Sequence, residues 1–282
     1  MISNATMIAC IVTLFISLVL PVLCLVVYGI RSGKQGVWSA WLLGAAGFFV
    51  MQILIRSPIL GVLAANTGFM AFSQRHPWVF SFGLAVSAAL FELVGRLAVA
   101  MLMRKRLTCR RALAAGMGHG SIEAILIVGL TYINNLVYMV MIQTGGFDAM
   151  VAQVPASGAD VSQLLAIRDS LLTLPAGVFL LAGYERLVTM VCQTAMSLMV
   201  CWGVFQKRML PWALACLGVH TLLDSAAGIQ NLVGKGLSQT AAYEIIYLIL
   251  TAAAVGCSVL MVRICRSWRG MERNLAVSQS EC

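Results

Sequence analysis

Long apolar runs separated by short polar segments dominate the sequence. Seven of these runs have about 20 or more residues, the length that an α-helix needs to cross a hydrocarbon core of about 30 Å. They are too long and too continuously apolar for the strands of a membrane barrel. We therefore predict an all-α, polytopic membrane helical bundle of about seven transmembrane helices. The predicted spans are residues 7–30, 37–57, 78–103, 112–142, 176–206, 211–232 and 240–264.

Composition agrees with this pattern. Hydrophobic residues make up 61% of the chain and charged residues only 10%, whereas a soluble domain carries about 25% charged residues. The nine cysteines are odd in number and contain no Cys-x-x-Cys pair, so we expect neither a disulfide framework nor a cysteine zinc site. The predicted location is a cell membrane, as a multi-pass protein.

Basic residues are concentrated at one set of span ends. Thirteen of them flank one side of the predicted membrane and four flank the other. Because cytoplasmic connections carry the basic excess, we predict the N-terminus outside and the C-terminus in the cytoplasm. Residues 1–266 are the predicted single transmembrane domain, and residues 267–282 are a polar cytoplasmic tail. Membrane topology explains the positive net charge, and no nucleic-acid partner is expected. The thirteen basic residues on the predicted cytoplasmic side are Arg31, Lys34, Arg104, Lys105, Arg106, Arg110, Arg111, Lys207, Arg208, Arg263, Arg266, Arg269 and Arg273.

Ionisable side chains also occur inside the predicted spans, where they are costly and mark functional sites. Three pairs of them stand four residues apart, and residues at that spacing share one face of a helix. A polar face in lipid turns toward the interior of the bundle, so we expect the three faces to meet at one site. The pairs are Glu92 with Arg96 in FELVGR, His119 with Glu123 in HGSIE, and His220 with Asp224 in HTLLD.

Three further polar residues lie on the fifth predicted span. At a rise of 1.5 Å per residue, Glu185 of YERL lies about 33 Å from the cytoplasmic end, near the outer boundary. Glu185 is therefore the weakest member of the predicted site, to which its neighbour Arg186 is also assigned. Gln193 lies two turns deeper and is better placed to reach it. The glycines at 116, 118 and 120 flank His119 and permit a close approach of backbone or substrate.

Two chemistries fit the three pairs. In the first, a divalent metal such as zinc is bound by four nitrogen and oxygen ligands, and Glu92 is a general base toward a metal-bound water. The ligands would be His119, Glu123, His220 and Asp224. In the second, no metal is needed: Glu92 activates water, and His119 and His220 hydrogen-bond the water or the developing oxyanion. Arg96 would then fix a carboxylate and Asp224 would orient His220.

Two other classes of function use the same residues. Carboxylate and histidine chains in membranes also relay protons and bind cations, so the residues alone favour a proton- or cation-coupled transporter. A non-catalytic membrane scaffold could retain the polar cluster for helix packing.

The motifs resemble those of a known family. The segments LIRSPIL, FELVGR, GMGHGSIEAIL, LTYINNLVY, ERL and HTLLD occur in this order. Together they resemble the YhfC family of bacterial membrane proteins from about residue 30 to the last span. The family is assigned to the glutamic-type intramembrane proteases and is related to the CPBP (Abi) group, which includes the prenyl-protein endopeptidases.

The resemblance implies that Glu92 and Arg96 match the acidic motif of that group, for which YERL is the alternative. It also implies that His119 is the catalytic histidine and that His220 with Asp224 is the late motif. It implies an intramembrane endopeptidase of the bacterial cytoplasmic membrane, acting on a membrane-embedded or lipidated peptide in the lipid bilayer. Glu92, His119 and His220 would be catalytic, with Arg96, Glu123 and Asp224 supporting them. Two positions depart from the pattern: Leu93 stands where a second glutamate is usual, and Gln193 where some relatives have histidine. Whether the site binds a metal is left open.

Overall fold

The computed structural model describes residues 2–33, 36–153 and 161–280, with side chains described as far as Asn274. Lys34, one of the thirteen basic residues, lies outside the described residues. The regular elements of the described part are helices, and no β-strand occurs among them. The predicted all-α class is therefore confirmed.

Seven helical segments are long and apolar enough to cross a membrane, as predicted, and each overlaps one predicted span. The second is longer than expected, because the helix continues through Pro58 to Ala64. Which side of the membrane holds each terminus stays a prediction. The segments are Asn4–Arg31, Val37–Ala64, Pro77–Arg106, Cys109–Thr144, Ala176–Phe205, Met209–Leu232 and Gln239–Asn274.

The chain divides into two compact units, and two long helical segments and α11 (Ala176–Phe205) pass from one unit into the other. Unit 1 comprises residues 1–23 and 124–187, and unit 2 comprises residues 24–123 and 188–282. The predicted domain boundaries stay a prediction.

In unit 1, α1 (Asn4–Leu14) packs against α8 (Leu130–Thr144), and α8 also contacts α9 (Gly146–Gln153) and α10 (Ser162–Thr173). The carbonyl oxygen of Phe179 ties this unit together, because it accepts hydrogen bonds from Thr13 at 2.8 Å and Tyr132 at 2.9 Å.

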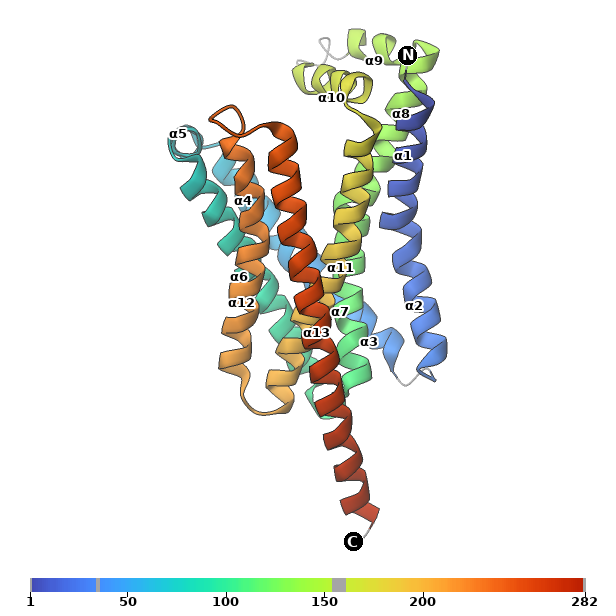
Figure 1. Ribbon diagram of the computed structural model, residues 1–282, viewed down its shortest axis with the longest axis vertical. Coiled ribbons are helices and arrows are strands. Elements are labelled where there is room, and N and C mark those ends of the chain that lie inside the picture. Colours follow the sequence, from blue (N-terminus) through green and yellow to red (C-terminus); the bar gives the residue numbers. More distant parts are fainter. Residues whose placement is uncertain (1, 34–35, 154–160, 281–282) are drawn as a thin grey trace. The chain divides into compact units, whose positions relative to one another are not determined.

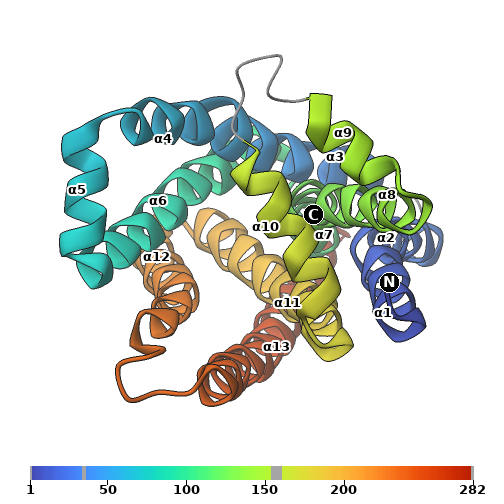
Figure 2. The ribbon, with the colours of Figure 1, turned by 90° about the horizontal axis from the view of Figure 1, so that it is seen from above.

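In unit 2, α3 (Val37–Phe48) packs against α7 (Cys109–Glu123), and α6 (Pro77–Met103) packs against both α3 and α12 (Met209–Ser225). Figure 2 shows α6 and α12 side by side. The last helix, α13 (Gln239–Ser280), contacts α12 and α7. It continues far beyond the predicted span, so residues 267–280 are helical (Figure 1).

Glycines on α7 bring its backbone close to two neighbouring helices. A Cβ atom on Gly118 would lie 2.0 Å from the carbonyl oxygen of Trp41 on α3. One on Gly116 would lie 2.7 Å from the carbonyl oxygen of Thr194 on α11. Membrane helices use small residues in this way to approach closely. The expected close approach around His119 is therefore found, and it fixes the depth at which α7 presents its polar face.

Candidate active site

The carboxylate of Glu92 is the centre of the site. It lies on α6 with 5% of its side chain exposed, and both of its oxygens have partners. Oε2 lies 2.9 Å from Nε2 of His119 and accepts a hydrogen bond from Nη2 of Arg96 at 3.0 Å. Oε1 accepts a hydrogen bond from Nε2 of Gln52 at 2.7 Å. These donors compensate a charge that would otherwise be costly to bury.

Gln193 of α11 joins the remaining groups to Glu92. Its Oε1 accepts a hydrogen bond from Arg96, while its Nε2 donates to Glu123 and, at 3.3 Å, to Glu92. Arg96 also donates from Nε to Oγ of Ser197, one turn further along α11, at 3.2 Å. Gln193 therefore reaches the site, as expected, and its amide contacts the carboxylates of both Glu92 and Glu123.

His220 approaches the same carboxylate from α12. Its Nε2 lies 3.7 Å from Oε2 of Glu92 and 3.4 Å from Oδ2 of Asp224. The imidazole is 3% exposed, whereas 37% of the Asp224 side chain is exposed, so Asp224 forms the accessible edge of the site. Nδ1 of His220 is buried and has no hydrogen-bond partner among the described residues. The three predicted pairs therefore meet, as the shared-face argument requires.

Glu185 and Arg186 have a different setting. Both belong to unit 1, and Arg186 donates a hydrogen bond to Glu185. The roles assigned to all of these residues stay predictions.

Gln52 and Arg56 contribute contacts that were not expected from the sequence. Arg56 donates to Oε1 of Gln52 at 3.2 Å and to the hydroxyl of Ser87 at 3.1 Å. The arginine thereby aligns the amide that holds Glu92. Gln52 and Arg56 stand four residues apart in an apolar span, the same spacing as the three predicted pairs, so this signal was available.

Phe48 closes the site on the α3 side. Its ring meets that of His119 edge to face, with the centroids 5.2 Å apart. Both residues are almost fully buried. The aromatic contact limits rotation of the imidazole and keeps its Nε2 directed at Glu92.

Glu92 and two neighbouring residues carry ligand atoms that fit a divalent metal. One ligand atom each from Glu92, His119 and Glu123 lie within 4.8 Å of one another, and all three residues are buried. Imidazole nitrogen and carboxylate oxygens are ligands that zinc accepts, and catalytic zinc sites keep three protein ligands and an open position. Two carboxylates this close also repel, which a cation relieves. This set shares His119 and Glu123 with the predicted ligands but contains Glu92 in place of His220 and Asp224.

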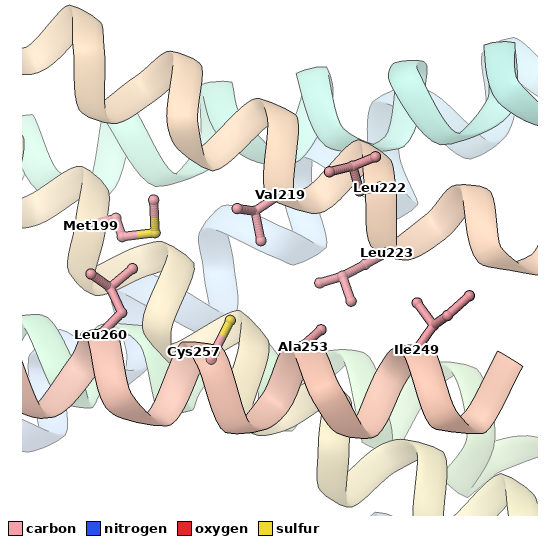
Figure 3. Close-up of a pocket in the computed structure, with 9 residues that line it drawn as sticks. Met199, Val219, Leu222, Leu223, Ile249, Ala253, Cys257 and Leu260 are labelled. Carbon is pink, nitrogen blue, oxygen red and sulfur yellow. The ribbon is translucent and has the colours of Figure 1, made fainter. Parts of the chain in front are cut away.

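An apolar cavity lies on the neighbouring face of α12 (Figure 3). Its volume is about 350 Å³. Val219 and Leu223 of α12 point toward α13, and Ala253 and Cys257 of α13 point back toward α12. His220 adjoins Val219 in the chain, so a single helix contributes to both the cavity and the polar site. The other lining residues are Met199, Leu222, Ile249, Gly256 and Leu260.

The fold and the site define a multi-pass membrane protein with a buried glutamate–histidine centre. The chain belongs to the YhfC family, since the family model described as YhfC intramembrane metalloprotease matches residues 13–248. It is also 31% identical over 244 residues to a Bacillus subtilis (strain 168) protein named "Uncharacterized membrane protein YhfC", covering 85% of this chain and 90% of that protein. No solved structure matches the chain. The family expected from the motifs is thus confirmed.

Proposed function

We propose that this protein is an intramembrane metalloprotease that hydrolyses a peptide bond of a membrane-embedded or lipidated substrate. One observation carries the proposal: the buried cluster in which Glu92, His119 and Glu123 place a ligand atom each within 4.8 Å of one another. The description of the matching family supports the same class.

Glu92, His119 and Glu123 would hold the divalent ion. When bound, such an ion supplies a Lewis acid that polarises the carbonyl of a scissile amide. Glu92, expected from the sequence to be a general base, is in this proposal a ligand, because it shares the cluster with the two other donors. Arg96 holds Glu92 in place through Nη2, and Gln52 fixes its other oxygen.

His220 is the proposed proton acceptor. Nε2 is the ring nitrogen that faces the carboxylates of Glu92 and Asp224, at 3.7 Å and 3.4 Å, so we assign the proton to Nε2 and the lone pair to Nδ1. Nδ1 has no partner among the described residues, so it can take the proton of the attacking water and later deliver it to the leaving amine. The carboxylate of Asp224 orients the imidazole and stabilises its charged form, as the aspartate does in Ser-His-Asp triads.

Arg96 is the proposed binder of substrate oxygen. Its Nη1 is buried and has no hydrogen-bond partner in the described part of the chain, while Nη2 and Nε are engaged with Glu92 and Ser197. A buried cationic donor of this kind stabilises negative charge that develops on a carbonyl oxygen.

The apolar cavity supports a substrate with a hydrocarbon portion. Every side chain that lines it is apolar or a cysteine, so a peptide backbone placed there would leave its polar groups unpaired. We therefore assign the cavity to an apolar side chain or lipid group of the substrate, with the scissile bond toward His220 on the same helix.

The proposal is tested with the full chain reconstituted in lipid nanodiscs and a library of membrane-spanning and lipidated peptides. Fragments are identified by mass spectrometry. The wild-type protein should cleave at least one peptide class. Glu92→Gln removes a proposed metal ligand and should lower the rate by about a hundredfold or more, since the loss of a residue that only supports a ligand already costs about 10–100-fold. Glu244→Gln is the matched control: Glu244 is an exposed glutamate of α13, and its variant should retain full activity.

Three outcomes contradict the proposal. If wild type and Glu92→Gln release the same fragments at the same rate, the site does not perform the cleavage. If no peptide is cleaved but proteoliposomes show a proton or cation flux that Glu92→Gln abolishes, the protein is a transporter. If neither cleavage nor flux is found, and Glu92→Gln binds its partner as the wild type does, the protein is a scaffold.

A further inference from the structure

A second cavity, the arginine pocket, lies in unit 2 at the other end of α7 from His119. It has a volume of about 910 Å³. Its walls come from the end of α2 (Leu20–Arg31), the start of α7 and the last turns of α13. The lining residues are Tyr28, Arg31, Ser32, Thr108, Arg110, Arg266, Arg269, Glu272 and Arg273.

Hydrogen bonds between its walls hold the arginine pocket together. The hydroxyl of Tyr28 donates to the carbonyl oxygen of Arg110 at 3.1 Å, which joins α2 to α7. Oε1 of Glu272 accepts a hydrogen bond from the backbone N–H of Cys109 at 2.9 Å, which joins α13 to α7. The arginines therefore project from three elements that are bonded to one another.

Positive charge in the arginine pocket exceeds negative charge. Five arginines and one glutamate line it, an excess of four positive charges. The carboxylate of Glu272 is engaged at the N-terminus of α7, where it also compensates the helix dipole. Arg31, Arg266 and Arg269 form no ion pair with any carboxylate that the structure describes. A topological preference for basic residues places them on one side of the membrane, but it does not require them to converge on a single cavity.

The chemistry of the lining selects a phosphate. Planar guanidinium groups bind phosphate oxygens with two parallel hydrogen bonds. Arg266, Arg269 and Arg273 follow one another at intervals of three and four residues on α13, so they share one face of that helix. The hydroxyls of Ser32 and Thr108 add neutral hydrogen-bonding groups to the lining.

Position favours a membrane lipid as the source of the phosphate. Two of the walls are the ends of membrane-spanning segments, at Arg31 and Cys109, which is the level at which phospholipid headgroups lie. Ile30 and Val262 are exposed apolar residues on α2 and α13, 65% and 47% accessible, and would contact acyl chains below the headgroup. Basic pockets between membrane helices are a known means of binding anionic headgroups.

We propose that the arginine pocket binds the phosphate-bearing headgroup of an anionic phospholipid in the adjacent leaflet. The lipid would link α2, α7 and α13. This inference is independent of the protease proposal, because it rests on none of the residues around Glu92.

The test compares lipid binding to the detergent-purified full chain by native mass spectrometry. Phosphatidylglycerol is compared with phosphatidylcholine, and wild type with Arg266→Gln/Arg269→Gln. Each arginine near a membrane contributes a factor of about five to binding, so the double variant should bind phosphatidylglycerol about twenty-fivefold more weakly. The matched control is Arg104→Gln/Arg106→Gln, which removes the same charge from the connection between α6 and α7, outside the pocket. It should bind as wild type does.

The proposal would be overturned if Arg104→Gln/Arg106→Gln lost as much affinity for phosphatidylglycerol as Arg266→Gln/Arg269→Gln, because surface charge in general would then attract the lipid. Equal binding of the two lipids by wild type would also overturn it. A third arm uses inorganic phosphate alone and follows the midpoint of thermal unfolding. If phosphate raises the midpoint of wild type but not of Arg266→Gln/Arg269→Gln, and phosphatidylglycerol does not compete, the ligand is a soluble phosphate and the lipid assignment is wrong. Circular dichroism of each variant checks that the helices remain folded.

Discussion

Nε2 of His119 lies 2.9 Å from Oε2 of Glu92, although 27 positions separate the two residues in the chain. The contact joins α6 to α7 at a point where both side chains are almost fully buried. An interaction of this kind between ionisable groups in an apolar environment is expensive unless further partners compensate the charge. Arg96, Gln52 and Gln193 provide that compensation here.

The first prediction concerns which residues hold a metal. Purified wild-type protein should carry about one divalent ion per chain, because catalytic zinc sites use three ligands of this type. His119→Ala and Glu123→Gln should lose it, while His220→Ala/Asp224→Asn should retain it, because those two residues lie outside the cluster. Metal content is measured by elemental mass spectrometry, with Glu185→Gln as the control.

Loss of the ion in His220→Ala/Asp224→Asn would instead support the four-ligand set expected from the sequence. A wild type without bound ion after purification under metal-replete conditions would contradict both ligand sets and favour the route in which Glu92 activates water directly.

The second prediction concerns the buried pair of Glu92 and Arg96, which are 5% and 1% exposed. Arg96→Met should lower the free energy of unfolding by about 3–5 kcal/mol, because it leaves the carboxylate buried without its cation. Adding Glu92→Gln should recover part of the loss, since both charges are then absent. The comparison is Arg168→Gln, which breaks an exposed pair with Asp148 and should cost no more than about 1 kcal/mol.

These free energies are measured by reversible denaturation in mixed micelles. If Arg96→Met and Arg168→Gln lower the free energy of unfolding equally, the burial of Arg96 does not matter. If the changes caused by Arg96→Met and Glu92→Gln simply add in the double variant, the two residues are energetically independent.

The third prediction concerns the glycine beside His119. Gly118→Ala would place a methyl group 2.0 Å from the carbonyl oxygen of Trp41, so α3 and α7 must move apart. We expect a loss of about 1–3 kcal/mol in the free energy of unfolding and reduced activity through displacement of His119. Gly218→Ala, close to His220 on α12, is the matched control, because nothing lies within 4 Å of its added methyl group.

Thermal unfolding and peptide cleavage are measured for both variants. Gly218→Ala should be neutral or slightly stabilising, as expected for alanine in a helix. If Gly118→Ala is as stable and as active as Gly218→Ala, contact between the backbones of α3 and α7 is not what positions His119.

The fourth prediction concerns the apolar cavity and depends on the proposed function. Gly256→Phe should fill part of the cavity, since its Cβ position is open and Gly256 is one of the lining residues. We expect kcat/KM for a lipidated or strongly apolar peptide to fall about tenfold, the scale at which hydrophobic pockets discriminate. Val255→Phe is the matched control, at an exposed neighbouring position that does not line the cavity.

Steady-state kinetics on both variants provide the measurement. Equal kcat/KM values for Gly256→Phe and Val255→Phe would remove the cavity from the substrate site and leave the cleavage proposal to be decided by Glu92→Gln alone.

The sequence determined the elements of this protein and the face that each presents. Apolar runs of spanning length are a local property of the sequence. Such runs form helices, because a helix pairs its own backbone polar groups and exposes none of them to lipid. The spacing of four residues in Glu92–Arg96, His119–Glu123 and His220–Asp224 follows from helix geometry, and the cost of charge in lipid turns those faces inward. Convergence of the three pairs was therefore predictable.

Only the tertiary structure decided which atoms meet. Contacts of Glu92 with Gln52 and Gln193, and the inclusion of Glu92 with His119 and Glu123 in one cluster, depend on the depth and rotation of neighbouring helices. Close backbone contacts at Gly116 and Gly118 set that depth, and no periodicity along one helix encodes it. The arginine pocket has the same origin, since its residues come from three elements far apart in the chain. A helix specifies its own polar face, whereas the partner of that face is chosen by packing between helices.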